Sequence, residues 1–277
     1  MIKKIIITIF SLILLTSCSD FNSPIEILDK EVMKYGIDVG LEDSVISSQI
    51  RDRLQEYYKD NGYYKLIFIG VPKLEYSQKN SVSCLVIDEA EKIGISDIIM
   101  DIRNIEFQNA TINSSMFMGK PSQNIILNFI FPENTVKTIE SFAFNGLNNN
   151  LKEVKIPDSV ITINDNAFAL NYSLEKLTLG NNIQTIEKNA FHYSTALTEL
   201  TIPASVKVIK SGAFSGSSGS QLTTVTYLGT SPNNITFDGK IFSSTQLKTL
   251  KIPNASNPDD PAWKTFLGGT FTDIRRQ

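Results

Sequence analysis

The sequence is poor in the residues that build covalent frameworks and catalytic centres. Its 277 residues include two cysteines, one tryptophan and one histidine, His192. Two cysteines are too few for a disulfide framework. A lone histidine excludes a histidine-rich metal site, and no pattern around it indicates a Ser-His-Asp arrangement. We expect His192 to be a variable residue at the solvent edge, and we expect no catalytic residue, no metal, no cofactor and no enzymatic activity.

The chain also lacks an excess of basic residues. It has 26 Lys and Arg against 29 Asp and Glu, and its net charge is −3. Nucleic acid is therefore not an expected partner, because nothing in the composition would neutralise phosphates. Two short acidic stretches, Glu42–Ser44 and Asp259–Asp260, lack the spacing of a calcium loop. No glycine-rich phosphate loop precedes a helix.

The N-terminus reads "MIKKIIITIFSLILLTSCSD". Lys3 and Lys4 precede an apolar run of about eleven residues, which is too short for a transmembrane helix and typical of a signal peptide. The stretch that ends at Cys18 resembles a bacterial lipobox. The resemblance implies a signal peptide over residues 1–17, diacylation of Cys18, a lipidated tether over 18–24 and attachment to a membrane through the lipid. The alternative is an ordinary secretory signal with a chance cysteine.

Lipidation of Cys18 would leave Cys84 without a cysteine partner. Cys84 lies in "SVSCLVI", an apolar stretch that we interpret as a possible strand. We therefore expect Cys84 to be a small buried hydrophobic residue rather than a nucleophile.

The second half of the chain repeats itself. Clear copies begin with "LKEVKIPDSVITINDNAF" at Leu151, "LEKLTLGNNIQTIEKNAF" at Leu174 and "LTELTIPASVKVIKSGAF" at Leu197, and weaker copies begin at Leu222 and Leu247. Each unit carries a marker phenylalanine with an Ile or Phe five positions before it. The marker phenylalanines are Phe117, Phe144, Phe168, Phe191, Phe214 and Phe242. The array is expected to cover residues 98–260.

A period of this length predicts a solenoid. In "LKEVKIP" apolar and polar residues alternate, which is typical of a short strand with one buried face. Such a strand buries that face only by stacking against its copies, so the repeats should form a parallel β-sheet and a continuous core. The fold class is an α/β-type repeat solenoid. The marker phenylalanines should stack at about the inter-strand distance of 4.8 Å and form a structural spine.

These segments, of the form L-x-x-(V/L)-x-I-P-x-S-V-x-x-I-x-x-x-A-F, resemble the BspA-like leucine-rich repeats of bacterial surface proteins. The resemblance implies a right-handed coil and a protein ligand, either a host matrix protein or a bacterial surface protein. It also implies a place in the bacterial cell envelope, at the outer membrane or cell surface. The chain departs from the pattern at Leu179-Gly180, which replaces Ile-Pro, and at Phe242, which has no alanine before it.

Both ends of the array need caps, because terminal repeats would otherwise expose their core. Residues 25–97 are interpreted as a cap of helix and strand, and the alternative is a small independent domain over 25–95. A helix is predicted there with Ser44 as N-cap, Gly62 as stop and one apolar face, followed by a strand in "YYKLIFIG". The apolar face consists of Ile46, Ile50, Leu54 and Tyr57. At the other end, residues 261–277 should form a cap in which Trp263 and Phe266 lie on a short helix.

The outward residues of the repeat strands are the candidate binding positions. We name these ten residues the candidate face. They are Glu153, Lys176, Glu199, Thr224 and Thr249 in one column, and Lys155, Thr178, Thr201, Thr226 and Lys251 in the other. Exposed threonine is favourable in strands for its own sake, so the face is either merely solvated or a protein-binding surface. The function expected is an envelope-anchored interaction or adhesion module, and the alternative is a periplasm-facing scaffolding lipoprotein.

Overall fold

The computed structural model describes residues 24–122, 125–216, 219–243 and 246–276. The expected signal peptide, Cys18 and the tether up to residue 23 lie outside these residues. The chain divides into two units, residues 1–34 and residues 35–277. The described part of the first unit belongs to helix α2, Pro24–Tyr35, which begins at the last residue of the expected tether.

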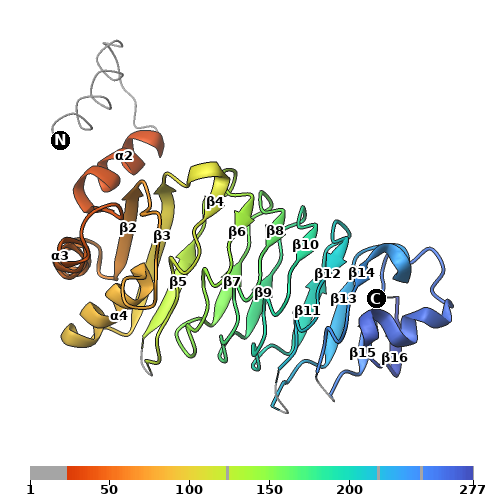
Figure 1. Cartoon of the computed structure of the whole chain (residues 1–277). Coiled ribbons are helices and arrows are strands. Elements are labelled where there is room, and N and C mark those ends of the chain that lie inside the picture. The colour runs from red at the N-terminus through yellow and green to blue at the C-terminus, as the bar shows by residue number, and fades with distance from the viewer. Residues whose placement is uncertain (1–23, 123–124, 217–218, 244–245, 277) are drawn as a thin grey trace, which may run out of the picture. The chain divides into compact units, whose positions relative to one another are not determined.

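The second unit begins with a parallel sheet and two helices (Figure 1). The sheet has the order β1-β2-β3-β5, and every neighbouring pair in it is parallel. The elements are β1 Gly36–Asp38, α3 Asp43–Asn61, β2 Lys65–Gly70, α4 Val82–Ile93, β3 Asp97–Ile105 and β5 Ile126–Ile130. Strand β2 confirms the strand predicted in "YYKLIFIG".

Helix α3 confirms the predicted apolar face. Its buried residues are Ile46, Ile50, Leu54 and Tyr57. It ends at Gly62, which adopts the left-handed conformation with φ 79° and donates its N–H to the Tyr58 carbonyl. The prediction of Ser44 as N-cap was wrong. The carbonyl of Glu42 already accepts the first helical hydrogen bonds, from the N–H groups of Val45 and Ile46, so Ser44 lies inside the first turn.

The interpretation of "SCLVI" as a strand was also wrong, because this stretch lies in helix α4. The Ser81 side chain accepts a hydrogen bond from the Cys84 N–H and caps the helix, and Gly94 ends it with φ 73°. Cys84 is buried, as predicted, and burial raises the pKa of its thiol. A thiol in this environment is a poor nucleophile.

One side of the repeat array is a continuous sheet of two-residue strands, which we name the short-strand sheet. All of its pairs are parallel, in the order β14-β12-β10-β8-β6-β4. The strands are β4 Thr111–Ile112, β6 Thr138–Ile139, β8 Thr162–Ile163, β10 Thr185–Ile186, β12 Val208–Ile209 and β14 Thr236–Phe237. Each ends with the Ile or Phe that precedes a marker phenylalanine by five positions. The isoleucines are fully buried, whereas Phe237 is 43% exposed.

The opposite side carries the strands of the candidate face, which are also parallel. They are β7 Glu153–Lys155, β9 Lys176–Thr178, β11 Glu199–Ile202, β13 Thr224–Tyr227 and β15 Thr249–Lys251, and a further strand, β16 Asp273–Arg275, pairs with β15. Strands β7 and β9 pair with each other, and β11, β13, β15 and β16 form a second sheet. Strands β9 and β11 do not pair, so this side is divided where one sheet was expected.

The marker phenylalanines form the predicted spine. Their ring centroids lie 4.9 Å apart for Phe144 and Phe168, and 5.2 Å apart for Phe168 and Phe191. The planes in these two pairs are within 7° of parallel. The last step, from Phe214 to Phe242, widens to 6.3 Å, at the unit that lacks the alanine. The alanines beside the phenylalanines are fully buried, and the backbone joins successive turns here, since the Phe168 N–H donates to the Ala190 carbonyl of the next turn at 2.7 Å.

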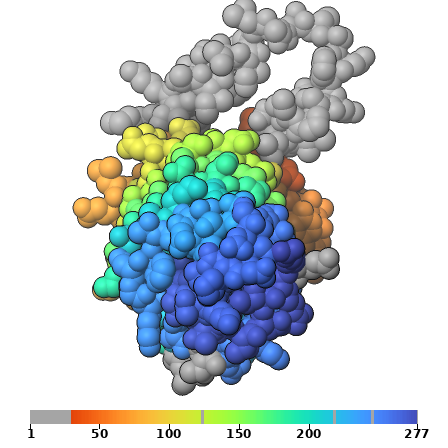
Figure 2. Space-filling view, turned by 90° about the vertical axis from the view of Figure 1, so that its right-hand side faces the viewer, coloured from red at the N-terminus to blue at the C-terminus, as the bar shows by residue number. Residues whose placement is uncertain are grey.

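One hydrophobic core runs from Ile37 to Phe271. Residues 35–97 therefore share their core with the repeats. At the other end, the 3₁₀ segment η3, Pro261–Gly268, buries Trp263 and Phe266, but its backbone is non-helical from Thr265 to Leu267, so only its first part is the predicted helix. The C-terminal residues, in dark blue, lie at this end of the chain in Figure 2. Two further 3₁₀ turns, η1 Gln108–Ala110 and η2 Pro232–Asn234, precede β4 and β14.

Candidate functional site

The candidate face is built by strand register. Glu153 pairs in register with Lys176, and Lys155 with Thr178. In the second sheet the two columns continue through β11, β13 and β15, as the sequence predicted. The columns are interrupted between β9 and β11, where no ladder exists. The ten positions therefore form two adjoining patches.

Exposure differs along the face. The six positions on β7, β9 and β11 are exposed, whereas Thr224, Thr226 and Lys251 are half-buried. Thr249 corrects the prediction, because it is buried and its Oγ1 donates to the Asp273 carboxylate at 3.0 Å. Asp273 belongs to β16, a strand that the repeat pattern did not predict. The accessible part of the candidate face is therefore its β7–β9–β11 portion.

The charges on this portion are only weakly engaged with each other. Lys176 Nζ lies 3.2 Å from Glu153 Oε1, and both side chains are more than half exposed. Such a pair stabilises the fold by no more than about 1 kcal/mol, because water screens it and both side chains lose entropy. A partner could therefore rearrange these charges at small cost.

Gly180 follows β9, next to the interruption. It stands where the neighbouring repeats have Pro157 and Pro203. A Cβ on Gly180 would lie 2.2 Å from the Pro157 carbonyl oxygen, so only glycine fits this backbone. The next residue, Asn181, donates its N–H to Asp158 Oδ1 at 2.7 Å. The turn after β9 is thus held against the turn after β7.

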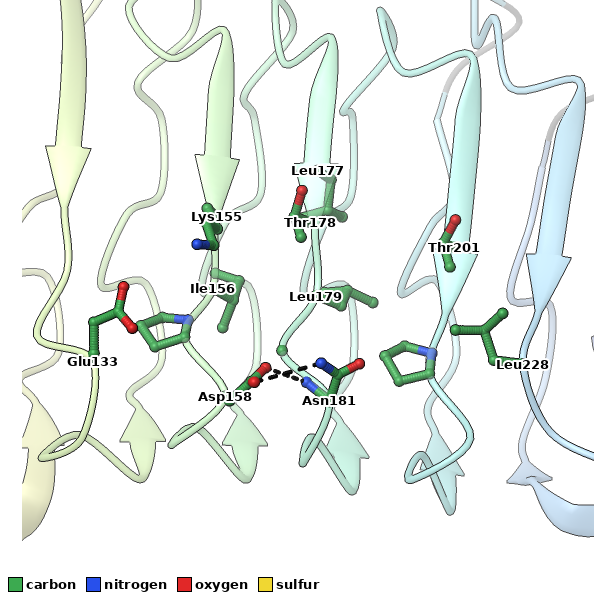
Figure 3. Close-up of a pocket in the computed structure, with 13 residues that line it drawn as sticks. Glu133, Lys155, Ile156, Asp158, Leu177, Thr178, Leu179, Asn181, Thr201 and Leu228 are labelled. Atoms are coloured by element: carbon green, nitrogen blue, oxygen red, sulfur yellow. Dashed lines mark hydrogen bonds between the residues drawn. The ribbon is translucent and has the colours of Figure 1, made fainter.

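A cavity of about 490 Å³ opens at this place (Figure 3). Pro157, Leu179 and Pro203 give it apolar walls. Polar groups around it come from four successive turns, namely Glu133, Lys155, Asp158, Thr178, Asn181 and Thr201. The volume is in the range of ligand pockets. Three candidate-face residues, Lys155, Thr178 and Thr201, line it, so the cavity and the face form one surface. We did not predict this cavity from the sequence. The sequence feature that marks its position is Leu179-Gly180, which replaces the Ile-Pro of the repeat.

The lone histidine and the lone tryptophan lie elsewhere. His192 is half-buried, its Nδ1 lies 2.6 Å from Ser215 Oγ, and burial lowers its pKa. It is therefore neutral at physiological pH. Trp263 is fully buried in the C-terminal cap and donates its Nε1–H to the Asn257 carbonyl. Neither side chain lines the cavity.

A buried ionic group in the N-terminal sheet was not predicted. The Asp101 side chain is fully buried, 3.3 Å from Lys65 Nζ and 2.6 Å from Arg103 Nη2. Burial alone would raise the pKa of this carboxyl, but the hydrogen bonds and charge of Arg103 outweigh burial and lower it. Lys65 on β2 and Asp101 and Arg103 on β3 thus form one ionic group across the two strands.

Among the described residues, no three His, Cys, Asp or Glu side chains cluster as a metal site. No helix within the same residues has the length and apolar character needed to cross a membrane.

The family comparison agrees with the repeat architecture. Residues 110–231 match the family described as BspA type leucine-rich repeat region, in six copies. A leucine-rich repeat protein from Bacteroides ovatus ATCC 8483, solved as a crystal structure, is similar at 17% identity with a TM-score of 0.37. The match covers 70% of this chain and 54% of that protein, so the chain spans about half of its length. No curated protein matches the sequence.

Proposed function

We propose that this chain, in which residues 110–231 form a BspA-type leucine-rich repeat region, is a protein-interaction module that binds its partner on β7, β9 and β11. The observation that carries the proposal is the continuity of an exposed, charged strand face with a cavity of about 490 Å³. A flat face provides area, and a concave site provides an anchor around which binding energy concentrates.

The composition of this surface favours a protein partner. It mixes both signs of charge with threonine hydroxyls and small apolar walls, and none of the residues that line the cavity is aromatic. Interfaces between proteins typically combine an apolar centre with a polar rim in this way. A surface with both signs of charge selects a partner by complementarity and disfavours a uniformly charged polymer.

The test is a charge reversal on the exposed strands. The intact chain is used to capture a partner, and its affinity is then measured for the double variant Lys176→Glu, Glu199→Lys. We expect an affinity loss of about tenfold or more, since two favourable contacts become repulsive, with an unchanged melting temperature. The matched control is Lys207→Glu, Glu187→Lys at the short-strand sheet, which should bind normally. Equal binding by both variants would remove the site from this face.

The anchoring of the module is a further part of the proposal. Cys18 at the end of the apolar N-terminal run supports lipidation, and attachment would place the repeats at the cell envelope as an adhesion module. Labelled fatty acid should enter the wild-type protein and not Cys18→Ser. Protease added to intact cells should remove the repeats if they face outward. Full protection would instead indicate the periplasm-facing scaffolding role.

A further inference from the structure

We infer that the cavity beside Gly180 binds an arginine side chain of a protein segment laid across β7, β9 and β11. This inference rests on the proposed function and gives it a recognition chemistry. It starts from the turn that departs from the repeat pattern, where Gly180 packs closely on the Pro157 turn and the cavity beside it is lined by Pro157 and Pro203.

The walls of the cavity suit an aliphatic stem. Pro157 and Pro203 stand on either side of Gly180, and Leu179, which is 6% exposed, closes the space behind it. An arginine carries three methylene groups that pack on apolar surface while the charged end stays near water. A proline at position 180 would add a third ring to the row formed by Pro157 and Pro203.

The charged groups favour a cation at the head of that stem. Glu133 and Asp158 line the cavity against one cation, Lys155 (Figure 3). Asp158 is already fixed in place, since the Asn181 N–H donates to its Oδ1 at 2.7 Å and the Asn181 side-chain amide donates to its Oδ2 at 3.4 Å, and each oxygen keeps a further lone pair. No hydrogen bond or ion pair engages the Glu133 carboxylate within the described residues. The two carboxylates lie on different turns, and the planar fork of a guanidinium can donate to acceptors in more than one direction, whereas an ammonium is a single point charge.

Lys155 has the opposite effect to the two carboxylates on the affinity for a charged occupant. It lies in the register column of Thr178, at the side of the cavity nearest to the strands. A cation in the cavity is repelled by Lys155 and attracted by the two carboxylates, whereas an acidic side chain would experience the reverse. The sign of each variant's effect on affinity therefore identifies the charge of the occupant.

The direct test uses three short peptides and the full-length chain. The probes are acetyl-Gly-Thr-X-Thr-Gly-amide with X as arginine, leucine or glutamate, followed by NMR of leucine and threonine methyl groups. The arginine peptide should shift the Leu179 and Thr201 resonances saturably. Because charge-assisted contacts add to apolar packing, its affinity should be at least about threefold higher than that of the leucine peptide. Stronger binding of the glutamate peptide, or no shift at these residues, would overturn the inference.

Variants of the cavity charges complete the test. Asp158→Asn keeps an acceptor for the Asn181 N–H, and Glu133→Gln breaks no bond of the described structure. Each should weaken the arginine peptide by roughly fivefold, and Lys155→Gln should strengthen it by roughly twofold. The matched control is Asp165→Asn, because Asp165 accepts the Lys188 N–H in the same inter-turn manner and lies outside the cavity.

The outcomes separate this inference from the proposed function. If a captured partner binds the face but is insensitive to Asp158→Asn and Glu133→Gln, the module stands and the arginine site is wrong. If the arginine peptide binds while charge reversal at Lys176 and Glu199 has no effect on the partner, the arginine site stands and the location of the protein interface is wrong.

Discussion

Gly180 and Pro157 lie so close that a single added carbon would place 2.2 Å between a side-chain atom and the Pro157 carbonyl oxygen. This contact joins the turns after β7 and β9, next to the step from β9 to β11 that has no ladder. One glycine between two prolines thus marks, in the sequence, the turn that lines the candidate binding site.

Gly180→Ala is expected to destabilise the chain by about 1–3 kcal/mol, because the new Cβ forces the backbone of two turns apart. Urea unfolding followed by circular dichroism measures this free energy. Thr201→Ala serves as the control in the same cavity, since its side chain is exposed and should change stability by less than about 0.5 kcal/mol. A neutral Gly180→Ala would mean that the close contact with Pro157 is not present in solution.

Phe191→Ala is expected to cost about 3–5 kcal/mol, as for a buried phenylalanine whose removal leaves a cavity. The ring is 1% exposed and stacks on both Phe168 and Phe214. The same unfolding measurement on Phe237→Ala should give a much smaller loss, because that ring is 43% exposed. Comparable losses for the two variants would argue against the aromatic spine as the source of stability.

Most of the fold that could be predicted from the sequence was predicted from the repeat period. The spine and the buried isoleucines follow from it, because every turn solves the same packing problem and so repeats the same residue. Helix α4 was missed because a run of four apolar residues fits a strand as well as a buried helix, and only the Ser81 cap distinguishes them. The burial of Thr249 was missed because β16 has no repeat signature. The cavity depends on the distance between two turns, which no single repeat encodes.

Acid should reveal the ionic group around Asp101. Its carboxyl has a folded-state pKa below the unfolded value, so its contribution to stability is present above the unfolded pKa and is lost as the pH falls through the folded pKa. Asp101→Asn should cost on the order of 3 kcal/mol at neutral pH, because it breaks a buried ion pair. Its loss of stability on acidification should also be shallower than that of the wild type.

The prediction for Asp101 is checked by measuring the free energy of unfolding in urea, from neutral pH down to the lowest pH at which the chain stays folded. Glu153→Gln is the control, since its exposed pair with Lys176 contributes at most about 1 kcal/mol. If Asp101→Asn and the wild type lost stability in parallel on acidification, the lowered pKa of Asp101 would not be a source of acid sensitivity.

Cys84 should resist thiol reagents in the folded chain. It is buried in α4, and burial raises the pKa of its thiol, so little thiolate is present or accessible. In a Cys18→Ser background, a chromogenic disulfide reagent should react with Cys84 only as fast as the chain unfolds, and the rate should rise steeply with urea. Rapid modification without denaturant would contradict the buried position.

The most direct test of the account is the footprint of a bound partner. Hydrogen–deuterium exchange on the intact chain, with and without the captured partner, compares the candidate strands with the short-strand sheet. We predict slower exchange in β7, β9, β11 and the turn that contains Gly180, and no change in β6, β8 and β10. Protection confined to the short-strand sheet, or to the N-terminal helices, would contradict the assignment of the binding surface.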